Sequence, residues 1–172
     1  KVLAQYITET YGADAKIRAS VSVDPIGTLT KNGTLSENAF TELKEVVDVT
    51  TGLKKLSVIN VNGKIFRDSG SSIVQELAFS LASGDEYLSQ LSEAGANVAA
   101  VAKKMKFNFG VGANYFMEIA KLRAARFLWA KIVEAYQPEC NCCKDCSCSD
   151  DCKDGICRCA AKMRIHSENT IW

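Results

Sequence analysis

The stretch from residue 105 to residue 138 constrains the fold most, because it contains one complete strand–loop–helix pattern. Residues 105–109 alternate between apolar and polar side chains, the two-residue period of a strand. After a loop with two glycines, Asn114 is a good helix N-cap, Glu118 puts negative charge in the first turn, and Pro138 ends the pattern. The apolar residues of this helix recur at amphipathic spacing, namely Tyr115, Ile119, Leu122, Ala125, Trp129, Val133 and Tyr136. The stretch predicts a β/α unit whose loop lies where parallel α/β folds place their chemistry.

Further strand and helix patterns alternate along the rest of the chain. The strand patterns cover residues 17–23, 56–61 and 163–166. The helix patterns are one that Gly12 ends, one that Ser36 caps and Gly52 ends, one from the capping box of Ser72 and Gln75 to Gly84, a short one over residues 87–91, and one from Asn97. Residues 25–33 and 62–70 are predicted to be loops, because they contain glycine, proline or polar residues.

Four strands that alternate with helices predict an α/β fold with parallel strands and right-handed crossovers. A complete (β/α)₈ TIM barrel takes roughly 250 residues. The 172 residues of this chain therefore fit about half of such a barrel. An open, doubly wound four-stranded sheet that is complete in itself fits the pattern equally well.

The charge balance gives no reason to expect a nucleic acid or an anionic membrane as a partner. The chain has 21 basic and 20 acidic residues, for a net charge of +1. No apolar run reaches the roughly 20 residues of a membrane-spanning helix, and no signal peptide is visible. The chain opens with Lys1 inside a helix pattern and ends at Trp172 directly after a strand pattern, so we expect a piece of a larger protein.

All eight cysteines lie in one segment, which we predict to be an insertion over residues 138–160, between the β/α units of residues 1–137 and a last strand in residues 161–172. The cysteine-free remainder fits a reducing, cytoplasmic environment. Closely spaced thiolates favour zinc, copper(I) or an iron–sulfur cluster, so the segment is predicted to be a metal-binding or redox module. The candidate metal ligands are Cys140, Cys142, Cys143, Cys146, Cys148, Cys152, Cys157 and Cys159. A loop without a role, disordered or cross-linked by disulfides, is the other interpretation.

Three stretches resemble the methylmalonyl-CoA mutase family, in the family's order and spacing apart from the cysteine segment. They are residues 70–87, residues 109–131 and the final Arg164-Ile-His-Ser-Glu-Asn-Thr-Ile-Trp172. The resemblance implies a TIM barrel that binds an acyl-CoA, followed by a cobalamin-binding domain that this chain lacks. The family's reaction is the adenosylcobalamin-dependent isomerisation between methylmalonyl-CoA and succinyl-CoA, in which the cofactor supplies the radical and the protein supplies orientation and shielding.

Several positions depart from the catalytic form of the family. Lys64-Ile65 stands where the family has a Tyr-His pair, and an isoleucine neither donates a hydrogen bond nor acts as an acid. Thr30 stands where a glutamine is expected, and Lys104-Met-Lys106 replaces an Arg-x-Ser. In the final motif Glu168 replaces a glutamine, and Ile171 replaces a glycine that lies against the corrin. The branched Ile171 side chain is expected to intrude on the cofactor face.

This pattern resembles the small, non-catalytic (beta) subunit of the heterodimeric bacterial enzyme. The resemblance implies a scaffold that pairs with the large catalytic subunit and that is not catalytic by itself. Arg164, His166 and Glu168 are the residues expected to face substrate or cofactor. The role of His166 is expected to be vestigial, and Arg164 either holds CoA phosphates or pairs with a carboxylate of the barrel. Adenosylcobalamin is expected in the whole enzyme but not on this chain. Because half a barrel leaves two sheet edges open, we expect the isolated chain to self-associate or to cover its edges with a helix.

Overall fold

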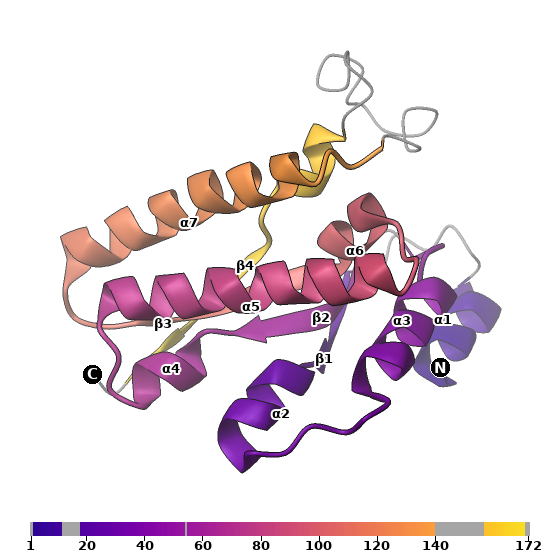
Figure 1. The fold of residues 1–172 in the computed structure, drawn as a ribbon, viewed down its shortest axis with the longest axis horizontal. Helices are drawn as coiled ribbons and strands as arrows, with labels where there is room; N and C mark the ends of the chain where they lie inside the picture. The colour runs from indigo at the N-terminus through magenta and orange to yellow at the C-terminus, as the bar shows by residue number, and fades with distance from the viewer. Residues whose placement is uncertain (1, 12–17, 54, 140–156, 171–172) are drawn as a thin grey trace.

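The computed structural model describes residues 2–11, 18–53, 55–139 and 157–170. Its centre is one sheet of four parallel strands in the order β1-β2-β3-β4 (Figure 1). The strands are β1 (Ala19–Val23), β2 (Leu56–Asn62), β3 (Met105–Val111) and β4 (Ile165–Asn169). The helices are α1 (Val2–Tyr11), α2 (Pro25–Asn32), α3 (Ala39–Val49), α4 (Lys64–Asp68), α5 (Ile73–Glu93), α6 (Val98–Lys104), α7 (Tyr115–Ala135) and the 3₁₀ helix η1 (Arg158–Ala161).

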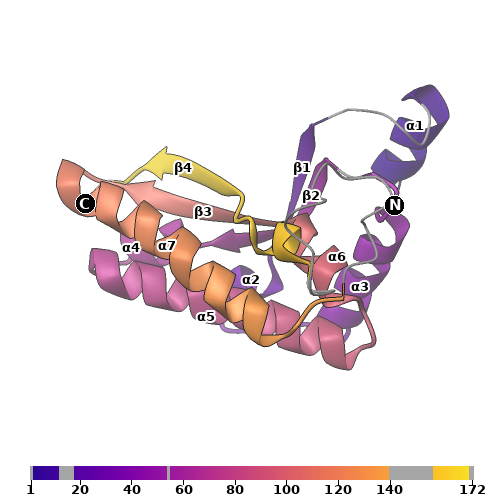
Figure 2. The same cartoon turned by 90° about the horizontal axis from the view of Figure 1, so that it is seen from above.

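The strand order decides between the two folds that the sequence left open. Each strand pairs with its neighbour along the chain, whereas a doubly wound sheet reverses its order at a switch point. Helices α5 and α7 lie together on one side of the sheet, and β3 and β4 lie behind them (Figure 2). The prediction of an α/β fold that forms about half of a TIM barrel is therefore confirmed. We call the side covered by α5 and α7 the helix side and the other side the open side.

Successive side chains of β3 point alternately to the helix side and to the open side of the sheet. Met105, Phe107 and Phe109 are buried, and the Phe107 ring packs edge-on against Trp129 of α7 at 4.7 Å between ring centroids. The residues between them, including Asn108, point to the open side because successive strand residues alternate. The helix side therefore holds the apolar core.

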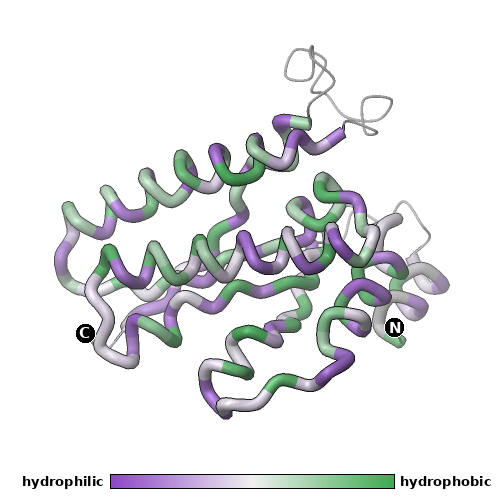
Figure 3. Tube along the Cα trace, in the orientation of Figure 1, coloured by the Kyte–Doolittle hydropathy of each residue, from purple (hydrophilic) through white to green (hydrophobic). Residues whose placement is uncertain are grey.

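The predicted helix over residues 115–136 is confirmed as α7, with the Asn114 side chain accepting from the Met117 N–H. Its predicted apolar stripe is buried only in the second half, at Ala125, Trp129 and Val133. Tyr115 is 69% and Ile119 is 40% exposed. In the first half of α7 the buried face is occupied instead by two charged residues, Glu118 and Lys121. Hydrophobic and hydrophilic residues alternate along α7 in Figure 3.

The prediction of loops at residues 25–33 and 62–70 was wrong, because each stretch contains a short helix directly after a strand. Residues 25–32 form α2, since Asp24 accepts a hydrogen bond from the Gly27 N–H and Pro25 fits the first helical turn. Gly33, with φ of 71°, ends this helix in the left-handed conformation. Residues 64–68 form α4, packed against the following long helix through Phe66 and Phe79.

The helix predicted to end at Gly84 and the short one after it form a single helix, α5. Its capping box of Ser72 and Gln75 is confirmed. Gly84 does not end a helix but lies within α5, at the point where the rings of Phe107 and Trp129 pack against it. A β-carbon there would lie 2.9 Å from both Phe107 Cζ and Trp129 Cζ3.

Other predicted boundaries moved by a few residues. The helix after residue 36 begins at Ala39 and is preceded by Asn38, so Ser36 is not its cap. The last strand is confirmed, but it covers residues 165–169 instead of 163–166. Asn97 caps α6 as predicted. The predicted helix end at Gly12 lies outside the described residues.

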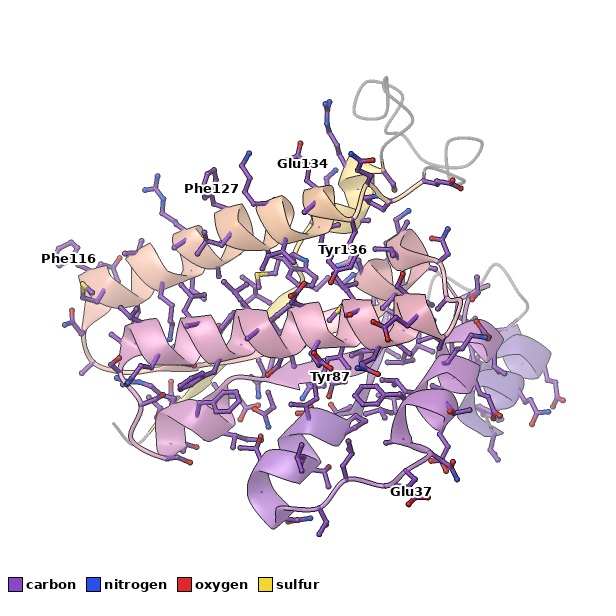
Figure 4. The ribbon with its side chains drawn as sticks, in the orientation of Figure 1. Glu37, Tyr87, Phe116, Phe127, Glu134 and Tyr136 are labelled. Carbon is purple, nitrogen blue, oxygen red and sulfur yellow. The ribbon has the colours of Figure 1, made fainter. Side chains whose placement is uncertain are left out.

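Tyr87 ties α2 to α5 below the sheet ends (Figure 4). Its hydroxyl donates to Asp24 Oδ1 at 2.7 Å and accepts from the Ile26 N–H at 2.9 Å. Burial, with the nearby Asp24 carboxylate, raises the pKa of Tyr87.

Among the helices of the described residues, none is long and apolar enough to cross a membrane.

Candidate functional site

The open side carries a row of polar side chains near the carboxyl ends of three strands. The register places Asn62, Asn108 and His166 side by side, and Glu168 beside Gly110 one step further. Asn108 Nδ2 donates to Glu168 Oε1 at 2.9 Å and to Asn62 Oδ1 at 3.3 Å. His166 Nε2 lies 3.6 Å from Glu168 Oε1. We call Asn62, Asn108, His166 and Glu168 the polar ladder.

The ladder is not fully hydrogen-bonded within the described part of the chain. Asn108 Oδ1 and Asn60 Oδ1 are buried and have no hydrogen-bond partner there. The His166 and Glu168 side chains are 55% and 47% exposed. This edge of the sheet therefore presents polar groups that a further molecule or protein segment could bond.

The position of the family's Tyr-His pair is occupied by an ion pair and an apolar residue. Lys64 donates to Asp68 one turn later in α4, and Thr170 Oγ1 donates to Asp68 Oδ1 at 2.7 Å. The hydrogen bond that Lys64 donates to Asp68 raises the pKa of Lys64, and the Glu168 charge adds to this. Lys64 is thus fixed as a cation within the chain's own network, and Ile65 offers no polar side-chain group.

Of the three residues expected to face substrate or cofactor, the structure brings two together. His166 and Glu168 share the ladder. Arg164 precedes β4, and its Nη1 donates to Ser57 Oγ at 2.8 Å. Burial, and then the charge of Arg18, lowers the pKa of Arg164. Arg164 therefore lies toward the amino end of the sheet, away from the carboxyl-end edge.

The replacements for the family's Arg-x-Ser and glutamine have local partners. Lys104 is buried, and its ammonium donates to the carbonyl oxygens of Thr50 and Leu53, each at 2.6 Å. Burial, and then the Arg164 charge, lowers the pKa of Lys104 to about 8. Thr30 Oγ1 donates to the Ile26 carbonyl within α2. Both side chains support the backbone.

A buried charged cluster on the helix side was missed by sequence reasoning. Lys121 Nζ lies 2.7 Å from Glu76 Oε2, 2.6 Å from Glu118 Oε2 and 2.5 Å from the Gly110 carbonyl oxygen. Glu76 Oε1 accepts from the Gly110 N–H at 2.7 Å, and Glu118 Oε1 accepts from the Gly112 N–H at 3.1 Å. We call Glu76, Glu118 and Lys121 the clamp, because they hold Gly110 near the end of β3 and Gly112 just after it.

The clamp lies in a low-dielectric environment. The Glu76 and Lys121 side chains are 0% exposed and that of Glu118 is 5% exposed. Burial raises the pKa of Glu76, and the hydrogen bond from Lys121 opposes this. The signal that could have revealed the clamp is the pair Glu118 and Lys121 on the face of α7 that continues into the buried Trp129. Glu118 therefore bonds Lys121 and the Gly112 N–H, besides placing negative charge in the first turn of α7.

Most of the cysteine segment lies outside the described residues, which include only Cys157 and Cys159 of the eight candidate ligands. Cys157 is 1% exposed and belongs to the core, and its N–H donates to the Pro138 carbonyl at 2.8 Å. That bond joins the two ends of the segment. Within the described ranges, no group of three or more histidine, cysteine or acidic side chains is arranged to hold a metal ion.

A parallel sheet wound in sequence order, with its polar groups at the carboxyl edge, defines the class of (β/α)-barrel proteins. The sequence model of the family described as methylmalonyl-CoA mutase matches residues 2–147. With most of its residues matched, the chain belongs to the methylmalonyl-CoA mutase family.

Individual relatives show the same similarity. The methylmalonyl-CoA mutase small subunit of Porphyromonas gingivalis is 44% identical over 126 residues, which are 73% of this chain and 20% of that protein. The large subunit from the same organism is 42% identical over 49% of this chain and 12% of its own length. The small subunit of Streptomyces virginiae is 36% identical over 71% of this chain and 20% of its own length. The chain thus spans about a fifth of the small subunits that it matches.

Proposed function

We propose that the chain is part of the barrel of a mutase small subunit and acts as a non-catalytic scaffold for a large catalytic subunit. The whole enzyme would interconvert methylmalonyl-CoA and succinyl-CoA. The observation that carries the proposal is the network at the family's Tyr-His position. There Lys64 is bonded to Asp68, and Ile65 has no group that could protonate or hydrogen-bond a substrate carbonyl.

The similarity to small subunits supports the same proposal. The two small-subunit relatives match more than two thirds of this chain, whereas the large subunit of Porphyromonas gingivalis matches about half. The clamp supports it too, because it preserves the loop after β3 while the residues of the catalytic form are replaced around it. His166, Glu168 and Arg164 would then be remnants of a substrate-facing set.

The mutase family depends on cobalamin, and we propose that this chain does not hold the cofactor. At the position of the family's Tyr-His pair the polar groups are engaged with one another, since Thr170 and Lys64 both bond Asp68. These residues do not fit a cofactor site, and we derive no reaction step for this chain. Ile171, the replacement expected to intrude on the corrin, lies outside the described residues.

Native mass spectrometry with the Porphyromonas gingivalis large subunit tests the proposal. We expect a one-to-one complex, and no conversion of methylmalonyl-CoA when the chain alone is incubated with adenosylcobalamin. Turnover by the chain alone would contradict a non-catalytic role. The absence of any complex would contradict the scaffold role.

Metal binding or a redox role of the cysteine segment remains a prediction from the sequence, because residues 140–156 lie outside the described part of the chain. Elemental analysis of anaerobically purified protein tests this. Zinc, copper or iron in whole-number ratios would support it, and metal-free protein with all thiols reactive would contradict it.

A further inference from the structure

The face of α7 opposite the core carries two large aromatic side chains with an arginine between them. The core face of the helix consists of buried residues, namely Glu118, Lys121, Ala125, Trp129 and Val133. Half a turn away, a second set recurs at positions i, i+4, i+7 and i+11, and all of its members are exposed: Phe116, Ala120, Arg123 and Phe127. We call these four residues the outer row.

The outer row exposes more apolar surface than the opposite side of an isolated barrel helix requires. Phe116 is 81% and Phe127 is 65% exposed, and Figure 4 shows both side chains on the side of α7 that points away from α5. Large aromatics that are exposed together on one helix face are typical of an interaction site. Because a helix rises 1.5 Å per residue, the row is about 16 Å long, which matches three turns of a second helix packed along it.

Extension of the sheet beyond β4 would not cover the outer row. Ala130 borders the cavity beside η1, the short helix that leads into β4, and Ile119 and Arg126 lie on the same flank of α7 as Ala130. A helix that followed a further strand would pack against this flank. The flank is roughly a quarter of a turn away from the outer row, so Phe116 and Phe127 would stay exposed.

Arg123 gives the outer row a positive charge that the fold does not neutralise. Within the described residues Arg123 makes no hydrogen bond and no ion pair. The acidic residues of α7 are the buried Glu118 and, beyond the row, Glu134, which lies 3.6 Å from Lys131. A partner that buries this face must therefore supply a carboxylate, because a cation buried without a counter-charge is strongly destabilising and arginine binds carboxylates through two parallel hydrogen bonds.

We propose that the outer row is the surface on which this chain docks a large mutase subunit, through a helix of that subunit that presents apolar side chains to the two rings and a carboxylate to Arg123. Aromatic residues and arginine are the types enriched at the energetic centres of protein interfaces. The small Ala120 leaves room between Phe116 and Arg123 for an apolar side chain of the partner. The inference rests on the proposed scaffold function and adds the position and the chemistry of the contact.

Binding of the 172-residue chain to the Porphyromonas gingivalis large subunit, measured by biolayer interferometry, tests the surface. Phe127→Ser and Arg123→Glu should each raise the dissociation constant at least about ten-fold, because each removes one of the central contacts. Arg123→Lys keeps the charge and should lose less than Arg123→Glu. Added salt should weaken the natural complex more than the complex of Arg123→Glu, in which the opposite-charge contact is absent.

Two matched controls alter other exposed positions. Val74→Ser removes an apolar side chain of α5 that is 67% exposed, and Lys31→Glu reverses an exposed charge at the end of α2. Both should bind like the natural chain. All replaced side chains are exposed, so the circular dichroism spectra of the variants should match that of the natural chain.

The outcomes separate this surface from the scaffold function. If the natural chain binds and Phe127→Ser and Arg123→Glu bind equally well, the outer row is not the docking surface, while the scaffold function stands. If the natural chain does not bind the large subunit, both proposals are overturned. Sedimentation equilibrium without the large subunit detects another occupant: a dimer that Phe127→Ser abolishes, while its binding to the large subunit is unchanged, would assign the row to a second copy and overturn the proposal.

Discussion

Two polar clusters lie at the same strand ends, one on each side of the sheet, and they differ in how deeply their charged side chains are buried. On the helix side, the clamp buries three charges and holds the backbone of Gly110 and Gly112. On the open side, the ladder leaves His166 and Glu168 half exposed, and its Asn108 Oδ1 has no hydrogen-bond partner in the described residues. The difference teaches that the helix side holds the fold, whereas the open side carries replaceable groups.

The largest loss of stability is expected when Lys121 of the clamp is replaced. Lys121→Met leaves two carboxylates buried without their cation, so we expect a loss of about 3–5 kcal/mol in the free energy of unfolding. Urea unfolding followed by circular dichroism measures it. Lys131→Met, on the exposed side of the same helix, is the control and should change stability by less than about 0.5 kcal/mol. Equal losses in both variants would show that the clamp is not special.

The tight contact at Gly84 sharpens the picture of the helix side. Gly84→Val would push its side chain against the Phe107 and Trp129 rings, and we expect a loss of about 1–3 kcal/mol. Ala82→Val, on the outward face of the same helix, controls for the helix propensity of valine. If Gly84→Val were as stable as Ala82→Val in thermal unfolding, the helices would not be packed as closely as described.

The buried Lys104 at the end of α6 gives the stability of the chain a pH dependence. Its pKa falls from an ordinary value of 10.5 to about 8 in the folded chain. Between these values the unfolded chain binds more protons, so the Lys104 contribution to stability rises with pH. The stability gap, taken as the free energy of unfolding of the natural chain minus that of Lys104→Met, should therefore grow by about 2 kcal/mol from pH 7.5 to 9.5. A gap that stays constant or shrinks would mean that Lys104 keeps its proton when buried.

The features that followed from sequence are those with strong local signals. The strand 105–109 alternates strictly, and Ser72 and Asn97 are capping residues whose side chains bond nearby N–H groups. Half a barrel followed from the order of these elements, and the choice against a doubly wound sheet required the strand order. Family resemblance pointed to His166 and Glu168, which the structure places together.

The features that the sequence could not reveal depend on distant contacts. Gly84 has the local signature of a helix end, yet its role is set by Phe107 and Trp129 from other elements. Pro25 and Gly27 suggested a loop, but Asp24 caps a helix there. The position of Glu118 in the first turn of α7 predicts a role toward the helix dipole. Its burial beside Lys121 depends on α5, which places Glu76 next to Lys121.

The most direct test of the account compares the two sides in one set of urea unfolding curves. His166→Ala/Glu168→Gln removes the exposed end of the ladder while leaving Asn108 an acceptor. We expect its free energy of unfolding to stay within about 0.5 kcal/mol of the natural chain, while Lys121→Met falls at least about 3 kcal/mol below it. A ladder variant that loses as much as Lys121→Met would contradict the account, because the open side would then be holding the fold.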